Sequence, residues 1–345
     1  MGDACGIGPE IAALLLARAD PDAAGAFVVG DVGVMRRAAA WTAAASGAAE
    51  SSGARLSTPV ATIERPDDVR RVPFGTVPVL PVEGLPADLL EAPVGHVDAR
   101  AGRAAGLAIE RAVALALAGE VAAVVTAPIH KEAFAAAGIV HPGHTEMLQA
   151  LAGGAPVRMM LANASLKTVL VTIHMALRDA IEAVTTERVL ETIRIADAAA
   201  RRWRPPGAPA PRVAVAGLNP HAGEGGLFGD EEIRVIAPAI AAARADGIDA
   251  SGPHAPDTVF MRARDASDHP GEFDLVVAMT HDHGLIPVKY LGLAEGVNVT
   301  LGLPFVRTSP DHGTAFDLAG TGRADPSSLA AALRMARALS AGSPP

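Results

Sequence analysis

The hydrophobic positions of this chain fall into short apolar runs that alternate with longer amphipathic stretches. Runs of four or five apolar residues are too short for most helices and predict buried strands; the clearest lie at 121–125, 213–216 and 275–279. Similar runs predict strands at 27–30, 77–80, 158–161, 168–172 and 297–305. Apolar residues at helical spacing predict helices at 32–45, 97–119, 132–137, 185–203, 230–247 and 327–341. This alternation predicts an α/β fold with a largely parallel sheet.

The segment GIGPE at 6–10 predicts a glycine turn that runs into a helix. Pro9 is suited to the first helical position, and the acidic Glu10 is suited to the first turn. Such a turn normally follows a strand, but only five residues precede Gly6. Either the helix begins the domain, or the first strand of the fold is missing from this chain.

Composition narrows the class of protein. A chain of 345 residues is long enough for about two domains. The formal net charge is −9 and the basic residues are scattered, which argues against a nucleic-acid partner. No apolar run reaches the length of a membrane span, and the N-terminal segment lacks the pattern of a signal peptide. Cys5 is the only cysteine, which excludes an internal disulfide and predicts a cytoplasmic location.

Three histidines share one topological position, directly after a predicted buried strand. They are His174, His221 and His281. Parallel strands place their carboxyl ends at one edge of the sheet, where ligands bind in open α/β sheets. Three imidazoles that converge there, beside Asp282 and Glu224, could bind Zn²⁺ or another divalent metal. Each could instead be an ordinary loop histidine, because their wide spacing is not a local metal motif.

A second group of polar residues suits an anionic, oxygenated substrate. Lysine and arginine supply positive charge, while histidine, threonine and asparagine supply directional hydrogen bonds. Taken singly, the lysine and the arginine could be solvated surface charges; their position beside strand ends argues otherwise. The group comprises His144, Thr145, Lys289, Asn298 and Arg307.

Several common motifs are absent from the sequence. The glycines at 6 and 8 do not form the GxGxxG dinucleotide fingerprint, and no P-loop is present. GEGG at 223–226 could bind an anion through backbone N–H groups or be a plain turn. There is no GxSxG, and Cys5 lies in the N-terminal turn, so a serine or cysteine nucleophile has little support.

Eight distinctive segments occur in order along almost the whole chain. They are GIGPE at 6–10, TAPIHKEA at 126–133, PGHTE at 142–146, HMALRDA at 174–180, GLNPHAGEGGLFG at 217–229, PDTVF at 256–260, THDHGLIPVKYLG at 280–292 and GVNVTLGLPFVRTSPDHGTAFDLAG at 296–320. Together they resemble the 4-hydroxythreonine-4-phosphate dehydrogenase family of the pyridoxal phosphate pathway.

This resemblance implies a two-domain α/β fold similar to isocitrate and isopropylmalate dehydrogenases, with the active site in the interdomain cleft. A cofactor-side domain is expected at 1–120 plus 292–345, and a metal, substrate and dimerisation domain at 121–291. The resemblance also implies NAD or NADP as the cofactor, one divalent metal (Zn, Mg or Co), and a homodimer with the metal site near the subunit interface.

The resemblance assigns roles to residues. The metal ligands fall on His174, His221 and His281, which would act in catalysis through the metal. The substrate contacts fall on the five residues of the anion-binding group above. HGTAFDLAG at 312–320 resembles the cofactor-binding loop, which points to His312, Gly313, Thr314, Ala315 and Asp317.

The chain departs from the family pattern at two places that bear on function. A strand and a Gly-Asp-Pro-like turn usually precede GIGPE in the family, and the resemblance leads us to expect that this first strand is absent here. His283 stands where the family usually has glutamine. Relatives also act on 4-phospho-D-threonate, 4-phospho-D-erythronate or aromatic cis-dihydrodiols, and retention of GHTE favours the phosphorylated substrates.

The expected activity is oxidation of 4-phosphooxy-L-threonine at C3 to a β-keto acid that decarboxylates to 3-amino-2-oxopropyl phosphate. The alternative is the same chemistry on 4-phospho-D-threonate or 4-phospho-D-erythronate, which gives dihydroxyacetone phosphate. A metal-dependent hydrolase and a non-catalytic phosphometabolite binder are more distant alternatives.

Overall fold

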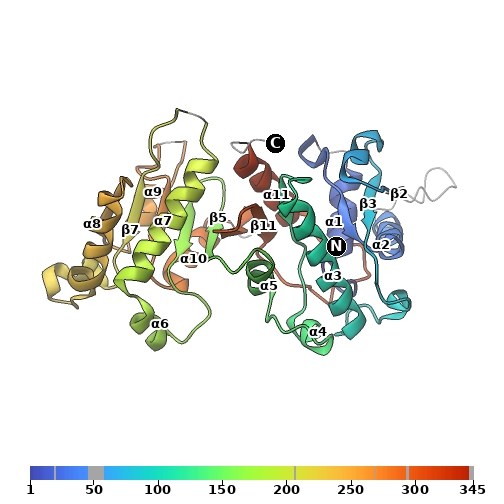
Figure 1. Cartoon of the computed structure of the whole chain (residues 1–345), viewed down its shortest axis with the longest axis horizontal. Helices are drawn as coiled ribbons and strands as arrows, with labels where there is room; N and C mark the ends of the chain where they lie inside the picture. Colours follow the sequence, from blue (N-terminus) through green and yellow to red (C-terminus); the bar gives the residue numbers. More distant parts are fainter. Residues whose placement is uncertain (19–20, 46–57, 206, 268, 293–294, 342–345) are drawn as a thin grey trace. The chain divides into compact units, whose positions relative to one another are not determined.

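The computed structural model describes residues 1–18, 21–45, 58–205, 207–267, 269–292 and 295–341 (Figure 1). The chain divides into two compact units. Unit 1 combines Met1–Ala155 with Arg307–Ala336, and unit 2 comprises Pro156–Val306 with residues 337–341. These boundaries differ from the expected ones at 120/121 and 291/292.

Local packing explains both differences. The segment after residue 120 stays in unit 1 because α4 (Lys131–Ala136) and α5 (His144–Leu151) pack on α3 (Ala99–Leu117). The segment after residue 291 begins in unit 2 because β10 (Val297–Leu301) pairs with β5 (Arg158–Ala162). Neither contact can be read from the local pattern of hydrophobic residues.

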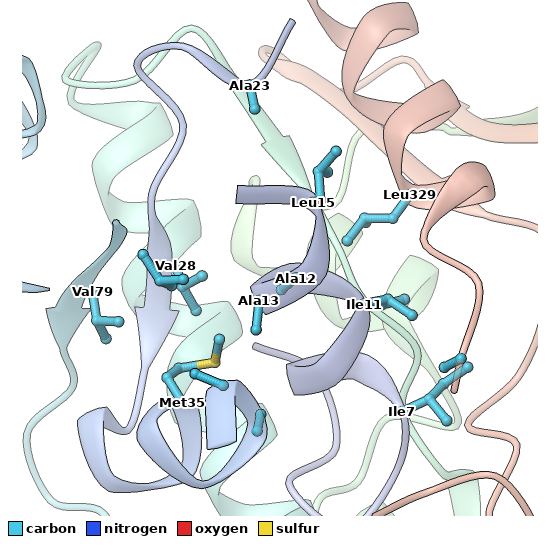
Figure 2. Packing of buried hydrophobic residues seen from close by; sticks show 14 residues of the cluster. Ile7, Ile11, Ala12, Ala13, Leu15, Ala23, Val28, Met35, Val79 and Leu329 are labelled. Carbon is cyan, nitrogen blue, oxygen red and sulfur yellow. The ribbon is translucent and has the colours of Figure 1, made fainter. Parts of the chain in front are cut away.

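Unit 1 is built on a small parallel sheet in the order β1-β3-β2, with β4 beside β11. Apolar side chains from α1, from two of these strands and from neighbouring helices form one core cluster, which includes Ile11, Val28 and Leu329 (Figure 2). The elements are α1 (Gly8–Ala17), β1 (Val28–Gly30), α2 (Val32–Ala45), β2 (Val60–Thr62), β3 (Val77–Pro81), β4 (Ala123–Val125), β11 (Val306–Pro310) and α11 (Ser327–Ser340), with 3₁₀ turns at Pro21–Ala23, Pro66–Arg71 and Leu89–Glu91.

Unit 2 is built on strands in the order β10-β5-β6-β9-β7-β8. From β6 to β8 the strands are parallel, and β5 runs antiparallel to both of its neighbours. The largely parallel sheet is thus confirmed for most of this unit. The elements not yet given are β6 (Lys167–Leu170), α6 (Leu177–Ala183), α7 (Thr186–Arg202), β7 (Val213–Ala216), α8 (Ala237–Ala245), β8 (Ala250–His254), α9 (Val259–Ala263), β9 (Leu275–Ala278) and α10 (His281–Tyr290).

Alternation of side chains along the strands separates two faces of the unit 2 sheet. One face carries Leu170, Ala214 and Val276, which form a core cluster with Val259 of α9 and Leu285 of α10. α7 packs against the same strands and covers the opposite face (Figure 1). Helices on both faces are what a buried parallel sheet requires.

Two predicted elements take a different form. The apolar run 297–305 is a strand only as far as Leu301, the end of β10, and β11 begins after the run, at Val306. The strand ends there because Gly302 adopts φ +94° and a Cβ at this position would collide with the carbonyl oxygen of Pro156. The predicted helix 230–247 begins as a π-helical turn, Glu232–Ile236, and continues as α8. Within the described ranges, no helix is both long enough and apolar enough to cross a membrane.

Candidate functional site

The three predicted metal histidines follow three neighbouring parallel strands of unit 2. In the strand order β9 lies between β6 and β7, and all three strands run in the same direction. His174, His221 and His281 lie in the segments that follow the carboxyl ends of these strands. The three segments therefore leave the sheet at one edge, as the sequence predicted.

The imidazole rings of His174 and His281 lie close together. Their centroids are 5.6 Å apart and their planes are inclined by 46°. Two imidazoles bound to one tetrahedral ion through nitrogens about 2.1 Å away would have centroids about 5 Å apart. The pair therefore fits as two ligands of one divalent metal. Nδ1 of His281 also makes a 2.8 Å hydrogen bond with Oδ1 of Asp282, the kind of outer contact that orients a metal-binding imidazole.

His221 is not part of this pair. Its ring lies 6.2 Å from that of Phe228, measured between centroids. In the part of the chain that the structure describes, no three His, Cys, Asp or Glu side chains are grouped to hold a metal ion. One chain thus brings together two of the three predicted metal ligands.

Backbone conformation singles out the same segments. Among the described residues, five that are not glycine have positive φ: His174, His221, Ala222, Glu224 and Ala315. This region costs an L-residue about 1–2 kcal/mol, and such strain collects at functional sites. All five lie either in the loops of two predicted metal histidines or in the 312–320 loop.

His283, the departure from the family pattern, lies in the first turn of α10. It is half-buried, and its Nδ1 has no hydrogen-bond partner among the described residues. Burial lowers the pKa of His283, and the nearby Asp282 carboxylate opposes that shift. The neutral form is therefore favoured at this position.

In unit 1, Arg307 provides a buried positive charge. Its side chain is 3% exposed, and Nη2 donates a 2.7 Å hydrogen bond to Oγ1 of Thr126. Burial lowers the pKa of Arg307 to about 10, so the guanidinium remains charged at neutral pH. Thr126, which orients this charge, cannot be identified as a functional residue from the sequence, because only the fold brings it beside Arg307.

His144 and Thr145 begin α5 in the same unit. Burial, together with the positive charge of Arg307, lowers the pKa of His144 well below its usual value. The imidazole is therefore neutral near pH 7 and can offer one hydrogen-bond donor and one acceptor. A neutral donor beside a buried cation suits an oxyanion of the substrate.

The lowered pKa of His144 predicts a pH-dependent stability. Between the folded-state pKa and the unfolded-state value of about 6.5, the unfolded chain binds more protons, so stability falls as pH falls through this window. We expect His144→Gln to lose part of the decrease in Tm that the parent protein shows between about pH 7.5 and about pH 5.5. His96→Gln, at an exposed histidine of unit 1, should leave that decrease unchanged. If Tm depends on pH in His144→Gln as it does in the parent protein, the pKa of His144 is not lowered in the folded state.

The other two predicted substrate contacts lie in unit 2. Lys289 is exposed in the last turn of α10. Asn298 pairs with Leu161 across β10 and β5, and opposed residues of antiparallel strands project from the same face. Leu161 packs with residues of α10, so Asn298 also projects from the face that α10 covers.

The predicted cofactor loop, 312–320, follows β11 in unit 1 and is held against the start of α1. The backbone N–H of Ile7 donates to the carbonyl oxygen of Thr314 at 3.0 Å. A Cβ at Gly6 would lie 2.9 Å from Cβ of Thr314, so this close approach requires glycine. Phe316 stacks on His130, with ring centroids 4.8 Å apart.

Glu10 fixes the end of this loop. Its buried carboxylate accepts backbone N–H groups of Gly320 and Gly322, both at 2.6 Å. The structure confirms that Glu10 lies in the first turn of a helix. Its contact with the loop cannot be predicted from the sequence, because its partners lie more than 300 residues away. The remaining predicted cofactor residues, His312, Gly313 and Asp317, belong to the loop that these contacts hold.

Comparison with known proteins gives consistent results along the whole chain. A family model described as "Pyridoxal phosphate biosynthetic protein PdxA" matches residues 22–336. The chain is 53% identical to a 4-hydroxythreonine-4-phosphate dehydrogenase of Beijerinckia indica, over 100% of this chain and 95% of that protein. It is 44% identical to a D-threonate 4-phosphate dehydrogenase of Pectobacterium atrosepticum, over 98% of this chain and 97% of that protein.

A solved structure agrees with the fold. The crystal structure of 4-hydroxythreonine-4-phosphate dehydrogenase from Klebsiella pneumoniae has 44% sequence identity and a TM-score of 0.85, over 99% of this chain and 96% of that chain. The α/β fold expected from the sequence is thereby confirmed. Because the family model and these relatives cover nearly all of its length, the chain belongs to the PdxA family.

Proposed function

We propose that this PdxA-family dehydrogenase oxidises the C3 hydroxyl of 4-phosphooxy-L-threonine. NAD⁺ or NADP⁺ would supply the acceptor for the C3 hydride, and the hydroxyl proton is released. The product is a β-keto acid, whose carboxylate leaves as CO₂; the resulting enolate takes up a proton at C2 to give 3-amino-2-oxopropyl phosphate. The observation that carries the choice of substrate is the 53% identity to the Beijerinckia indica enzyme, against 44% for the D-threonate 4-phosphate dehydrogenase.

His174, His281 and His221 are assigned as the metal ligands. A divalent ion bound there, Zn²⁺, Mg²⁺ or Co²⁺, would supply Lewis-acid stabilisation of the developing alkoxide and enolate. Asp282 holds the His281 ring through Nδ1, which keeps Nε2 available. The pair of rings in one chain supports this assignment.

Arg307 and His144 are assigned to the anionic groups of the substrate. Arg307 is a buried cation that Thr126 orients, and guanidinium groups bind carboxylate and phosphate in defined geometry. His144 is held neutral and can donate without adding charge. Thr145, Lys289 and Asn298 are proposed as further polar contacts.

The 312–320 loop is assigned to the cofactor. Its backbone is tied to α1 through Ile7 and Glu10, so the loop is held in place before any ligand binds. NAD⁺ or NADP⁺ bound at this loop would accept the hydride. Such preorganisation lowers the entropic cost of binding.

A homodimer is proposed from the surface of unit 2. The segments that follow β6, β7 and β9 each expose large apolar side chains, for example Leu177 (66% exposed), Leu227 (73%) and Ile286 (63%). These segments also carry the three metal histidines. Exposed apolar residues concentrated in this way mark interaction sites, and a second copy of the chain is the partner that we assign to them.

The alternative substrates are 4-phospho-D-threonate and 4-phospho-D-erythronate. The 44% identity to a D-threonate 4-phosphate dehydrogenase favours 4-phospho-D-threonate between these two. Oxidation at C3 gives a β-keto acid in either case, so both 4-phosphooxy-L-threonine and 4-phospho-D-threonate release CO₂ and NAD(P)H. They differ at C2, where an amino group leads to 3-amino-2-oxopropyl phosphate and a hydroxyl leads to dihydroxyacetone phosphate.

A direct comparison of the two substrates tests the proposal. Purified protein is assayed with each substrate, with NAD⁺ or NADP⁺ and a divalent metal, and the three-carbon product is identified. We expect kcat/KM for 4-phosphooxy-L-threonine to exceed that for 4-phospho-D-threonate by about tenfold or more, because a site built for an amine leaves polar groups unpaired with the wrong substituent. A preference for the substrate that yields dihydroxyacetone phosphate would overturn the substrate assignment and leave the reaction type in place.

A further inference from the structure

The turn that carries His221 has an unusual backbone. From His221 to Gly226, six consecutive residues have positive φ. L-residues visit this left-handed region singly and not as runs, and three of these six residues have a side chain. A turn of this kind persists only where the surrounding structure holds it, so some group outside the turn must fix it.

The group that does so is the carboxylate of Glu232, which is 2% exposed. Its Oε1 accepts the backbone N–H groups of Leu218 and Asn219, both at 2.7 Å. Its Oε2 accepts Nδ2 of Asn219 at 3.0 Å. These are the two residues through which the chain enters the turn, so the buried Glu232 carboxylate fixes the backbone of its entrance. The side-chain Nδ2 of Asn219 also donates to Oε2 of Glu231 at 2.7 Å.

Two glycines leave space for that carboxylate. A Cβ at Gly217 would lie 3.0 Å from Oε1 of Glu232, and a Cβ at Gly223 would lie 2.7 Å from Oε2. Glu232 is also the first residue of the π-helical turn before α8, a feature that inserts one residue and often occurs at functional sites. The glycines, the π-turn and the carboxylate thus form one arrangement around the His221 turn.

We propose that Glu232 is a positioning residue that fixes the turn presenting His221. The inference rests on the proposed function only in treating His221 as an active-site residue. Glu232 does not itself contact substrate or cofactor; it acts through the backbone of Leu218 and Asn219.

Glu232→Gln tests the proposal with little change of shape. A glutamine amide has one acceptor oxygen, and its NH₂ group would face either the two backbone N–H groups or the side-chain NH₂ of Asn219. We expect the amides of Leu218 and Asn219 to exchange hydrogen about tenfold faster or more, because hydrogen bonds to a charged acceptor are the stronger kind. The Gly217 amide, which donates to the carbonyl oxygen of His254 at 2.7 Å, should keep its protection.

The effect must also reach His221. In Glu232→Gln we expect the ring signals of His221 to shift in NMR spectra of histidine-labelled protein, and kcat to fall while KM for NAD(P) stays the same. Glu187→Gln, at an exposed carboxylate of α7 in the same unit, should change none of these quantities.

Two outcomes would overturn the proposal: parental protection of the Leu218 and Asn219 amides in Glu232→Gln, or loss of that protection with an unchanged His221 signal. If neither the parent protein nor Glu232→Gln oxidises the proposed substrates, the proposed function fails. Amide hydrogen exchange and the His221 ring signals, compared between these two proteins, still decide the role of Glu232.

Discussion

Replacing His174 or His281 by alanine is expected to reduce turnover on the order of 1,000-fold, because Lewis-acid stabilisation of a developing oxyanion is worth several kcal/mol. Each ring supplies one of two neighbouring imidazoles at the carboxyl ends of β6 and β9. The variants should bind less divalent metal and keep the parent fold, since residues in strand-end loops contribute little to core packing. Metal content and NAD(P)H formation, measured on the same preparations, check this result.

The backbone strain at His174 allows a test of whether this residue serves function or stability. His174 has φ +42°, which glycine tolerates without the steric cost that an L-residue bears. We therefore expect His174→Gly to lose activity while its Tm stays the same or rises. His269→Ala, at an exposed histidine of unit 2, serves as the control with full activity. Full metal occupancy and parental turnover in the His174 and His281 variants would end the assignment of this pair.

The edge of the unit 2 sheet at which the three histidine segments leave could be predicted from the sequence, because the direction of the strands alone determines it. Each of the three apolar runs before His174, His221 and His281 is short and continuous, which identifies a strand buried on both faces. Such strands are parallel in an α/β protein, so their carboxyl ends share an edge. The structure adds that β6, β9 and β7 are direct neighbours, which periodicity alone does not reveal.

The supporting contacts could not be predicted, because they join residues that are distant in sequence or depend on backbone conformation. Thr126 and Arg307 are 181 positions apart, and the hydrophobic pattern is informative only within a window of one element. The left-handed turn at His221 could not be predicted from the sequence either, because Ala222 and Glu224 are not residues that normally indicate positive φ. Both features therefore needed the folded structure.

The boundaries of the two units differ from the predicted domain boundaries for a related reason. Residues 121–155 read as the start of a second α/β segment, with β4 followed by α4 and α5. In the structure both helices pack on α3, and the backbone N–H of Thr126 bonds to the carbonyl oxygen of Thr308. Strand–helix alternation indicates the class of fold, whereas the choice of packing partner decides the unit to which a segment belongs.

Replacing Arg307 by lysine is expected to raise KM for the phosphorylated substrate on the order of 100-fold, since disturbing a buried, hydrogen-bonded charge commonly costs about 2–5 kcal/mol. Lysine keeps the positive charge but lacks the planar set of donors, and it cannot reproduce the fixed geometry that the 2.7 Å bond to Thr126 gives the guanidinium. Thr126→Val should change KM in the same direction and by a smaller factor, because it removes the orienting acceptor and leaves the cation.

The pattern of kinetic constants then distinguishes substrate binding from loss of structure. If Arg307 binds the substrate, KM for NAD(P) and Tm should change little in Arg307→Lys, because the cofactor loop is held by separate contacts to Ile7 and Glu10. Arg334→Lys, at an exposed arginine of α11, should match the parent protein in every constant. A proportional loss of affinity for substrate and cofactor, together with a lower Tm, would show that Arg307 supports the core of unit 1 and does not bind the substrate.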